Sequence, residues 1–249
     1  MTDMKYMAPF QSGRSRAQVA VVLLAISMAV DLIAIVSSFF QASLLSNAAA
    51  GLGITIADAT ANDSREQLIA IIQLLVLVAT AVCFLMWIHR AHKNLPALGA
   101  GNLEYSPGWA VGGFFVPFLN IVRPFQVMRE IWKASDPEVE LSIPHSWQYV
   151  ATSPLIGFWW AAWLISNLLG QLVFRLSGEN NSIDDLLALT YLAIASDVVG
   201  IIAAVFAILL VRNIDGRQER KFQRLVAFYT PPPQQPPPPN DLAWGQGTQ

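Results

Sequence analysis

Residues 67–88 read QLIAIIQLLVLVATAVCFLMWI, an apolar run without a single charged side chain. A helix needs about 20 mostly apolar residues to cross a hydrocarbon core of about 30 Å. Residues 17–40, 151–174 and 187–211 form three further runs of this kind, and none of the four contains Lys or Arg. We therefore predict four transmembrane helices and an all-α fold, an integral membrane four-helix bundle.

The composition is that of a membrane protein rather than a soluble one. Of the 249 residues, 54% are hydrophobic and 13% are charged, and the mean hydropathy is +0.46. The formal net charge of -2 leaves no excess of Lys and Arg for binding phosphates, so no nucleic-acid partner is expected. The single cysteine, Cys83, excludes an intramolecular disulfide and a cysteine-based metal cluster.

No pattern in the sequence predicts catalysis, a metal or a cofactor. The Gly-x-Ser-x-Gly and His-Glu-x-x-His patterns, a phosphate-binding glycine loop and the Gly-x-Gly-Asp pattern of intramembrane aspartyl proteases are absent. His89 and His92 lie three residues apart, but two ligands without a carboxylate partner are too few for a strong metal site. We expect no enzymatic activity and no cofactor.

The basic residues predict the orientation in the membrane, because short cytoplasmic loops accumulate Lys and Arg. All of the 15 basic residues except Arg65 and Arg175 precede the first apolar run, lie between the second and third, or follow the fourth. Both termini are therefore predicted to be cytoplasmic.

The first run also has features of a cleaved signal peptide, since basic residues precede it and Ala48–Ala50 follow it. The run is too long for the apolar part of a signal peptide, and Asp31 interrupts it. We expect an uncleaved signal anchor.

The chain divides into three predicted parts. Residues 1–16 form a cytoplasmic N-terminal segment, residues 17–226 form the membrane domain, and residues 227–249 form a cytoplasmic tail. The tail is proline-rich and expected to be disordered, because such a composition favours extended polyproline II over a packed core. Pro233 and Pro236 have the spacing that aromatic-lined grooves recognise, which indicates a protein partner.

Residues 107–135 contain a fifth, shorter apolar stretch. It is interrupted by Gly112, Gly113 and Pro117, and basic residues flank it on both sides. Because both flanks are of cytoplasmic type, we predict a hairpin between spans two and three that is re-entrant or interfacial and leaves the membrane on the cytoplasmic face it entered. After Pro124 the pattern becomes amphipathic and predicts a short interfacial helix.

Several short sequences in this central region resemble those of a known family. They are WIHRAHKNL (87–95), SPGWAVGG (106–113), PFLN (117–120), RP (123–124), MREIW (128–132) and GFWWAAW (157–163). They are similar to the uncharacterised bacterial multi-pass membrane family labelled domain of unknown function 4328. The resemblance covers roughly residues 17–226, and it implies a bacterial plasma-membrane protein without an assigned activity. The candidate interfacial residues in this region are Trp87, Arg90, Asn94, Pro107, Gly108, Trp109, Pro117, Asn120, Pro124, Glu130 and Trp132.

Trp87, Arg90 and Asn94 fall on one face of a helix that continues past the second span. One interpretation is a recognition surface that binds a lipid headgroup or holds the hairpin carrying Asn120 and Glu130. The other is ordinary anchoring, with Trp87 in the aromatic belt and the Arg90 side chain reaching to the interface.

Each predicted span carries one polar residue at a similar depth, about 21 to 24 Å from the cytoplasmic face at 1.5 Å per residue. These residues are Asp31, Gln73, Asn167 and Asp197. No basic residue is available at that depth, so at least one carboxyl group is expected to carry a proton. The layer either fixes helix register through hydrogen bonds or forms a proton- or ion-linked site.

The sequence favours a membrane-embedded scaffold or regulatory module that recruits protein partners, partly through the tail. The alternative is a small transporter or channel component that uses the polar layer. Because four spans are few for a self-contained transporter, this alternative requires a homo-oligomer.

Overall fold

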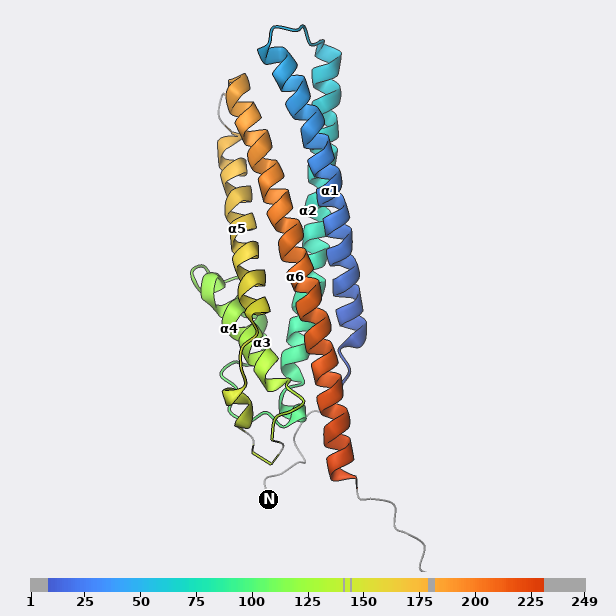
Figure 1. Ribbon diagram of the computed structural model, residues 1–249, viewed down its shortest axis with the longest axis vertical. Helices are drawn as coiled ribbons and strands as arrows, with labels where there is room; N and C mark the ends of the chain where they lie inside the picture. The colour runs from blue at the N-terminus through green and yellow to red at the C-terminus, as the bar shows by residue number, and fades with distance from the viewer. Residues whose placement is uncertain (1–8, 141, 144, 179–181, 231–249) are drawn as a thin grey trace, which may run out of the picture.

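Four long helices make up most of the molecule (Figure 1). The computed structural model describes residues 9–140, 142–143, 145–178 and 182–230, and every regular element in them is helical. The long helices are α1 (Arg14–Ala49), α2 (Ile56–Lys93), α5 (Pro154–Leu176) and α6 (Ile183–Tyr229). Each is long and apolar enough to cross a membrane, so the prediction of an all-α protein with four candidate spans is confirmed.

Two parts of the sequence prediction lie outside the described residues. Residues 1–8 belong to the predicted N-terminal segment, and residues 231–249 contain the prolines of the predicted tail. The disorder of the tail and its partner therefore stay predictions.

Three of the long helices extend well beyond the apolar runs they contain. α1, α2 and α6 have 36, 38 and 47 residues, whereas about 20 residues cross the hydrocarbon core. Thr55 and Ser182 start α2 and α6 with capping boxes, in which Asp58 and Asp185 return the hydrogen bond. At the other ends, good helix formers such as Arg, Gln, Glu and Lys continue both helices past the apolar run.

The long helices pack as two antiparallel hairpins, α1 with α2 and α5 with α6 (Figure 1). α6 also packs along α1 and so joins the two hairpins. In contrast, α2 and α5 do not pack along each other in the part of the chain that is described. The bundle is therefore tightly packed on three sides and loosely packed between α2 and α5.

Four short helices lie at one end of the bundle, which we call the short-helix end. They are η2 (Pro96–Leu98), α3 (Pro107–Gly112), α4 (Leu119–Ala134) and η3 (Ser146–Tyr149). The first and last described residues also lie at this end (Figure 1). The last residues of α1 and α5 and the first residues of α2 and α6 lie at the opposite end, which we call the loop end.

The start of α4 differs from the prediction. The helix was expected after Pro124, but it begins at Leu119 and contains this proline. Phe118, with a φ of 65°, reverses the chain just before the helix. Pro124 lies in the second turn, where it removes only the backbone hydrogen bond to the Asn120 carbonyl. One lost hydrogen bond does not stop a helix whose apolar face is buried.

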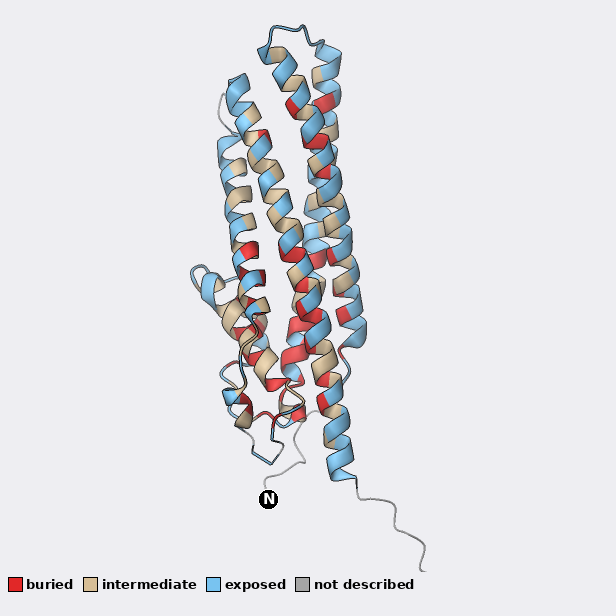
Figure 2. Cartoon of the chain, in the orientation of Figure 1, coloured by how far each residue is buried: buried red, intermediate tan, exposed pale blue. Residues whose placement is uncertain are grey.

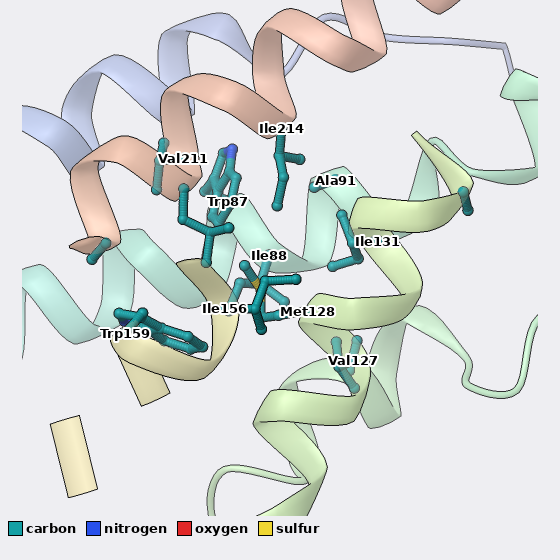
Figure 3. Close-up of a cluster of buried hydrophobic side chains, with 14 of the residues drawn as sticks. Trp87, Ile88, Ala91, Val127, Met128, Ile131, Ile156, Trp159, Val211 and Ile214 are labelled. Carbon is teal, nitrogen blue, oxygen red and sulfur yellow. The ribbon is translucent and has the colours of Figure 1, made fainter. Parts of the chain in front are cut away.

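The buried side chains gather at the short-helix end (Figure 2). Here α2, α4, α5 and α6 meet around Trp87, Met128, Ile131, Ile156 and Ile214, each at most 1% exposed (Figure 3). Further along the bundle the long helices turn large apolar side chains outward. A lipid bilayer would cover these outward-facing side chains, as expected of a multi-pass membrane protein.

Candidate functional site

A cavity of about 670 Å³ lies among the four long helices. All four contribute to its lining, together with Phe114 and Phe115 from the turn between α3 and α4. The volume is within the range of small-molecule sites. The only ionisable side chains in the lining are Asp31 and Asp197, so the cavity has acidic groups and no basic one.

Three of the four predicted polar-layer residues meet at this cavity. The Gln73 amide nitrogen donates one hydrogen bond to Asp31 Oδ1 (3.1 Å) and another to Asp197 Oδ1 (3.2 Å). One amide on α2 thereby links a carboxyl group of α1 to a carboxyl group of α6. We call Asp31, Gln73 and Asp197 the acidic cluster.

Asn167, the fourth residue of the predicted layer, lines the same cavity but does not join the cluster. Its amide nitrogen donates to the backbone carbonyl of Trp163, one turn earlier on α5 (2.8 Å). All four residues that were predicted to share a depth thus line one cavity, and three of them are joined by hydrogen bonds.

Small residues bring α5 and α6 close together beside the acidic cluster. The Ser166 and Ser196 hydroxyl groups donate to each other's backbone carbonyl, at 3.4 and 3.3 Å. A Cβ atom on Gly200 would lie 3.4 Å from Ser166 Oγ and 3.6 Å from Asp31 Oδ2, in contact with both. Sequence reasoning missed these residues, although Ser166 with Gly170 and Ser196 with Gly200 have the four-residue spacing of small residues at membrane helix contacts.

Aromatic side chains form the wall of the cavity toward the short-helix end. Phe84 of α2 lies with its ring centroid 5.9 Å from that of Trp159 on α5, and Trp163 also lines the cavity. Trp160 stacks on Trp163 (4.7 Å) and donates its ring N–H to the Ile121 carbonyl of α4 (2.8 Å). The tryptophans of α5 therefore connect the cavity wall to the hairpin.

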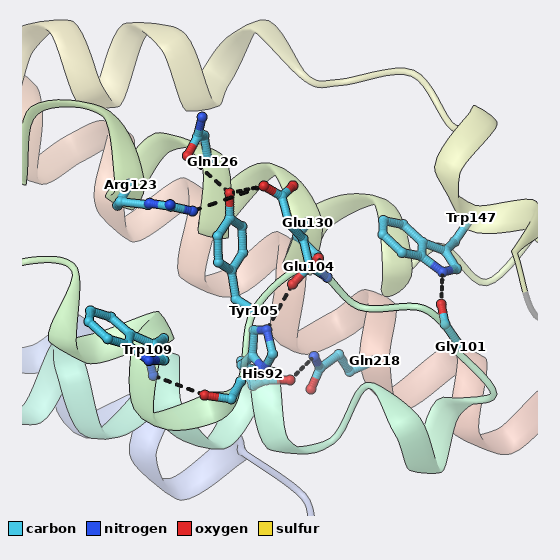
Figure 4. A network of polar contacts seen from close by, with 12 residues as sticks. His92, Gly101, Glu104, Tyr105, Trp109, Arg123, Gln126, Glu130, Trp147 and Gln218 are labelled. Carbon is cyan, nitrogen blue, oxygen red and sulfur yellow. Dashed lines mark hydrogen bonds and ion pairs between the residues drawn. The ribbon is translucent and has the colours of Figure 1, made fainter. Parts of the chain in front are cut away.

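A second polar network lies at the short-helix end (Figure 4). The His92 ring nitrogen Nε2 is 2.8 Å from Glu130 Oε1, and both side chains are at most 5% exposed. The other Glu130 oxygen accepts a hydrogen bond from the backbone N–H of Glu104 (2.5 Å). Glu130 thus ties α4 both to α2 and to the segment before α3.

Arg90 and Asn94 do not contact this pair. Both donate to the Gln11 carbonyl, at 3.3 and 2.9 Å, and Asn94 also donates to Gln218 of α6 (3.2 Å). They hold the N-terminal segment against α2 and α6, whereas His92 holds the hairpin that carries Glu130. Sequence reasoning had considered His92 only as a metal ligand.

The remaining candidate interfacial residues lie in helix turns, at helix starts or in packed contacts. Ser106 accepts from the Trp109 backbone N–H (3.3 Å) and so caps α3, whose first residue is Pro107. Pro117 and Asn120 flank the start of α4, Gly108 lies in the first turn of α3, and Trp87 and Pro124 are buried. The Arg217 guanidinium lies over the Trp132 ring, 4.2 Å from its centroid.

The Tyr105 hydroxyl group, in the segment before α3, lies next to a carboxylate. Tyr105 Oη lies 2.5 Å from Glu104 Oε1 and 3.0 Å from Gln126 Oε1. Burial and the adjacent Glu104 carboxylate raise the pKa of Tyr105, so its hydroxyl stays protonated at neutral pH. Among the described residues, no group of three or more His, Cys, Asp and Glu side chains is arranged to hold a metal ion.

Four long apolar helices, each able to cross a membrane, define the class: a multi-pass membrane protein, with a cavity among its helices that contains two carboxyl groups. Residues 50–216 match the model of a domain of unknown function, DUF4328, and the chain belongs to this family. The match confirms the resemblance that the central sequences indicated, and Asp31 lies outside the matched range. No curated protein and no solved structure matches the chain.

Proposed function

We propose that this protein is a small transporter or channel component that binds its ligand in the central cavity and links binding to the protonation of the acidic cluster. The observation that carries the proposal is the Gln73 amide, which links Asp31 to Asp197 beside a cavity of about 670 Å³. Ionisable groups within a membrane bundle are rare and commonly belong to ion or proton pathways. In this proposal the protein is not an enzyme.

The half-buried state of the cluster favours this role over a purely structural one. A carboxyl group that only fixes helix register does so best when its partners close it off completely. Asp31, Gln73 and Asp197 are each only partly buried and line open space. They can therefore exchange a proton or meet a ligand without unpacking the helices.

A scaffold or regulatory module that recruits protein partners is the second candidate function. Its support is the Pro233-Gln-Gln-Pro236 sequence in the tail, which has the spacing of polyproline ligands. Deleting residues 231–249 should abolish co-purification of a partner from mild detergent and leave the thermal unfolding of the bundle unchanged. A partner that persists after the deletion would contradict recruitment through the tail.

The proposed setting is a bacterial plasma membrane with both termini in the cytoplasm. The unequal distribution of Lys and Arg supports this orientation, which places the short-helix end on the cytoplasmic side. The hairpin of α3 and α4 then contacts lipid as a re-entrant or interfacial element. In support, Phe115 and Phe118 at its turn are 70% and 84% exposed, which suits an apolar environment.

Proton flux in proteoliposomes tests the proposed function. Vesicles that contain the protein and a pH-sensitive dye should show acidity-dependent flux, and Asp31→Asn should abolish it. Asp63→Asn is the matched control, because Asp63 is exposed on α2 and does not line the cavity. Equal flux in both variants would overturn the role of the cluster. Cross-linking in the same vesicles should give the homo-oligomer that four spans require.

A further inference from the structure

The hydrogen bonds of the acidic cluster indicate which kind of ligand the cavity accepts. An amide nitrogen has two hydrogens, and Gln73 uses one on each carboxyl group. Three oxygens of the cluster remain after these two hydrogen bonds: Oδ2 of Asp31, Oδ2 of Asp197 and the amide oxygen of Gln73. No described residue donates a hydrogen bond to any of them. When both carboxyl groups are ionised, a ligand that completes the cluster must therefore be a hydrogen-bond donor.

The charge of the cavity adds a second requirement. The ionisable side chains of its described lining are the two carboxyl groups. Arg65 and Arg175 lie toward the loop end and do not line the cavity, and the Arg65 guanidinium is already engaged. Arg65 lies 3.4 Å from Glu66 and donates to Ser37 Oγ (2.7 Å) and to Asn62 (2.6 Å). A positively charged donor would thus meet two carboxyl groups with no other cation in the cavity lining, and its binding would release the proton expected on at least one of them.

The way into the cavity adds a third requirement. Three pairs of long helices pack along each other, whereas α2 and α5 have few contacts, so we take the side between α2 and α5 as the opening. Leu74 and Leu77 of α2 and Phe174 of α5 line this side, and they are 59%, 62% and 83% exposed. The opening is therefore apolar and at the depth of the hydrocarbon core.

We propose that the ligand of the cavity is an amphipathic ammonium ion that enters from the bilayer between α2 and α5. The inference rests on the proposed function, because it names the ligand of the same site. The N–H groups of the ammonium donate to the three free oxygens of the acidic cluster. The alkyl chain lies along the aromatic wall, where Phe84, Trp159 and Trp163 also offer ring faces to the cation.

Binding of chain-matched probes to the unmodified protein provides the test. The protein is placed in nanodiscs of neutral phospholipid, and decylammonium, decanoate and decanol are titrated by calorimetry against empty nanodiscs as the partition control. Saturable binding of decylammonium alone supports the inference. Equal binding of all three probes, or of none, overturns it. This comparison needs no variant, so it does not depend on the folding of a mutant.

Variants then locate the binding site. Replacing both Asp31 and Asp197 by Asn should weaken decylammonium binding by about tenfold or more, because both counter-charges are lost. Asp63→Asn should bind as the unmodified protein does. Weakening by the same factor in both variants would place the ammonium elsewhere and overturn the assignment.

A bulky side chain at the opening tests the route. Ala81 lines the cavity from α2 and is exposed, so Ala81→Trp narrows the gap toward α5 without disturbing a packed contact. Ala79→Trp is the matched control, since Ala79 is exposed on α2 and does not line the cavity. Slower decylammonium binding in Ala81→Trp alone supports lateral entry. Equal rates in the two variants overturn it.

The two proposals can fail separately. Proton flux that depends on Asp31, together with no preference for decylammonium over decanoate, would overturn the ammonium ligand and leave the proposed function standing. Saturable, carboxylate-dependent binding of decylammonium without any flux would support the ligand and overturn transport.

Discussion

The short-helix end and the central cavity use the same polar groups in opposite ways. At the short-helix end, Glu130 places both of its oxygens on protein donors and is 5% exposed. In the cavity, the Asp31 and Asp197 carboxyl groups each accept a hydrogen bond from Gln73 on one oxygen, and no described residue donates to the other oxygen. A carboxyl group whose two oxygens both have protein donors stabilises the fold. A carboxyl group with one oxygen left without a donor can bind a ligand.

The packing is also denser around the short-helix end than around the cavity. Four helices and an apolar core surround the His92–Glu130 pair, whereas α2 and α5 separate around the acidic cluster. Substitutions at the short-helix end should therefore change the free energy of unfolding. Substitutions in the cavity should change binding and leave stability almost intact.

Trp87→Ala should have the largest effect on stability. Trp87 is 1% exposed in the core of the short-helix end, and truncating such a side chain leaves a large void. We expect a loss of about 3–5 kcal/mol in the free energy of unfolding. Thermal unfolding in detergent measures it, with Trp109→Ala as the control because Trp109 is 59% exposed. Equal losses in the two variants would show that the short-helix end is not the stable core.

Glu130→Ala should have the next largest effect. Among the described residues, Glu130 is the only hydrogen-bond partner of the His92 side chain, and the other ring nitrogen, Nδ1, is buried without one, so the substitution leaves both nitrogens unpaired. It also leaves the Glu104 backbone N–H without its acceptor. We expect a loss of about 3 kcal/mol. Glu138→Ala, on an 84% exposed side chain, serves as the control and should unfold as the unmodified protein does.

The helices and the polar layer could be predicted because each rests on local sequence. Apolar run length identifies the spans, and rise per residue places Asp31, Gln73 and Asp197 at one depth. The predicted spans are shorter than helices α1, α2 and α6, which contain them, since the apolar run marks the membrane and the capping residues mark where a helix starts. Thr55 and Ser182 carried this second signal.

The contacts between distant segments could not be predicted in the same way. The face shared by Arg90 and Asn94 follows from helix geometry, but their partner Gln11 depends on how the N-terminal segment returns to α2. The pairing of His92 with Glu130 depends on the path of the hairpin between them. The cavity depends on how far α2 and α5 lie apart beyond their contact at Phe84 and Trp159, which no single helix encodes.

Gly113→Ala should have a smaller effect on the free energy of unfolding. Its comparison with Gly112→Ala distinguishes a tightly packed position from one with ordinary van der Waals contact. A Cβ atom on Gly113 would lie 2.9 Å from the Arg123 Cβ atom, so α3 and α4 must move apart. A Cβ atom on Gly112 would meet its nearest neighbour, in the Trp109 ring, at 3.6 Å. We expect Gly113→Ala to lose about 1–2 kcal/mol and Gly112→Ala to lose nothing, by thermal unfolding. The reverse order would contradict the close packing of the hairpin.

Replacing both Asp31 and Asp197 by Asn should have the smallest effect on stability and the largest on binding. The Asn side-chain oxygens can still accept the two hydrogen bonds from Gln73, so the link between α1, α2 and α6 persists. We expect a change of less than about 1 kcal/mol, the scale of one hydrogen bond between membrane helices. Unfolding and proton flux should be measured on the same preparation, because only their combination is decisive. If this variant loses as much stability as Glu130→Ala, the acidic cluster is a structural tie like the His92–Glu130 pair, and the contrast between the two regions disappears. If stability stays while flux and decylammonium binding are lost, the open oxygens of the cavity carry the function.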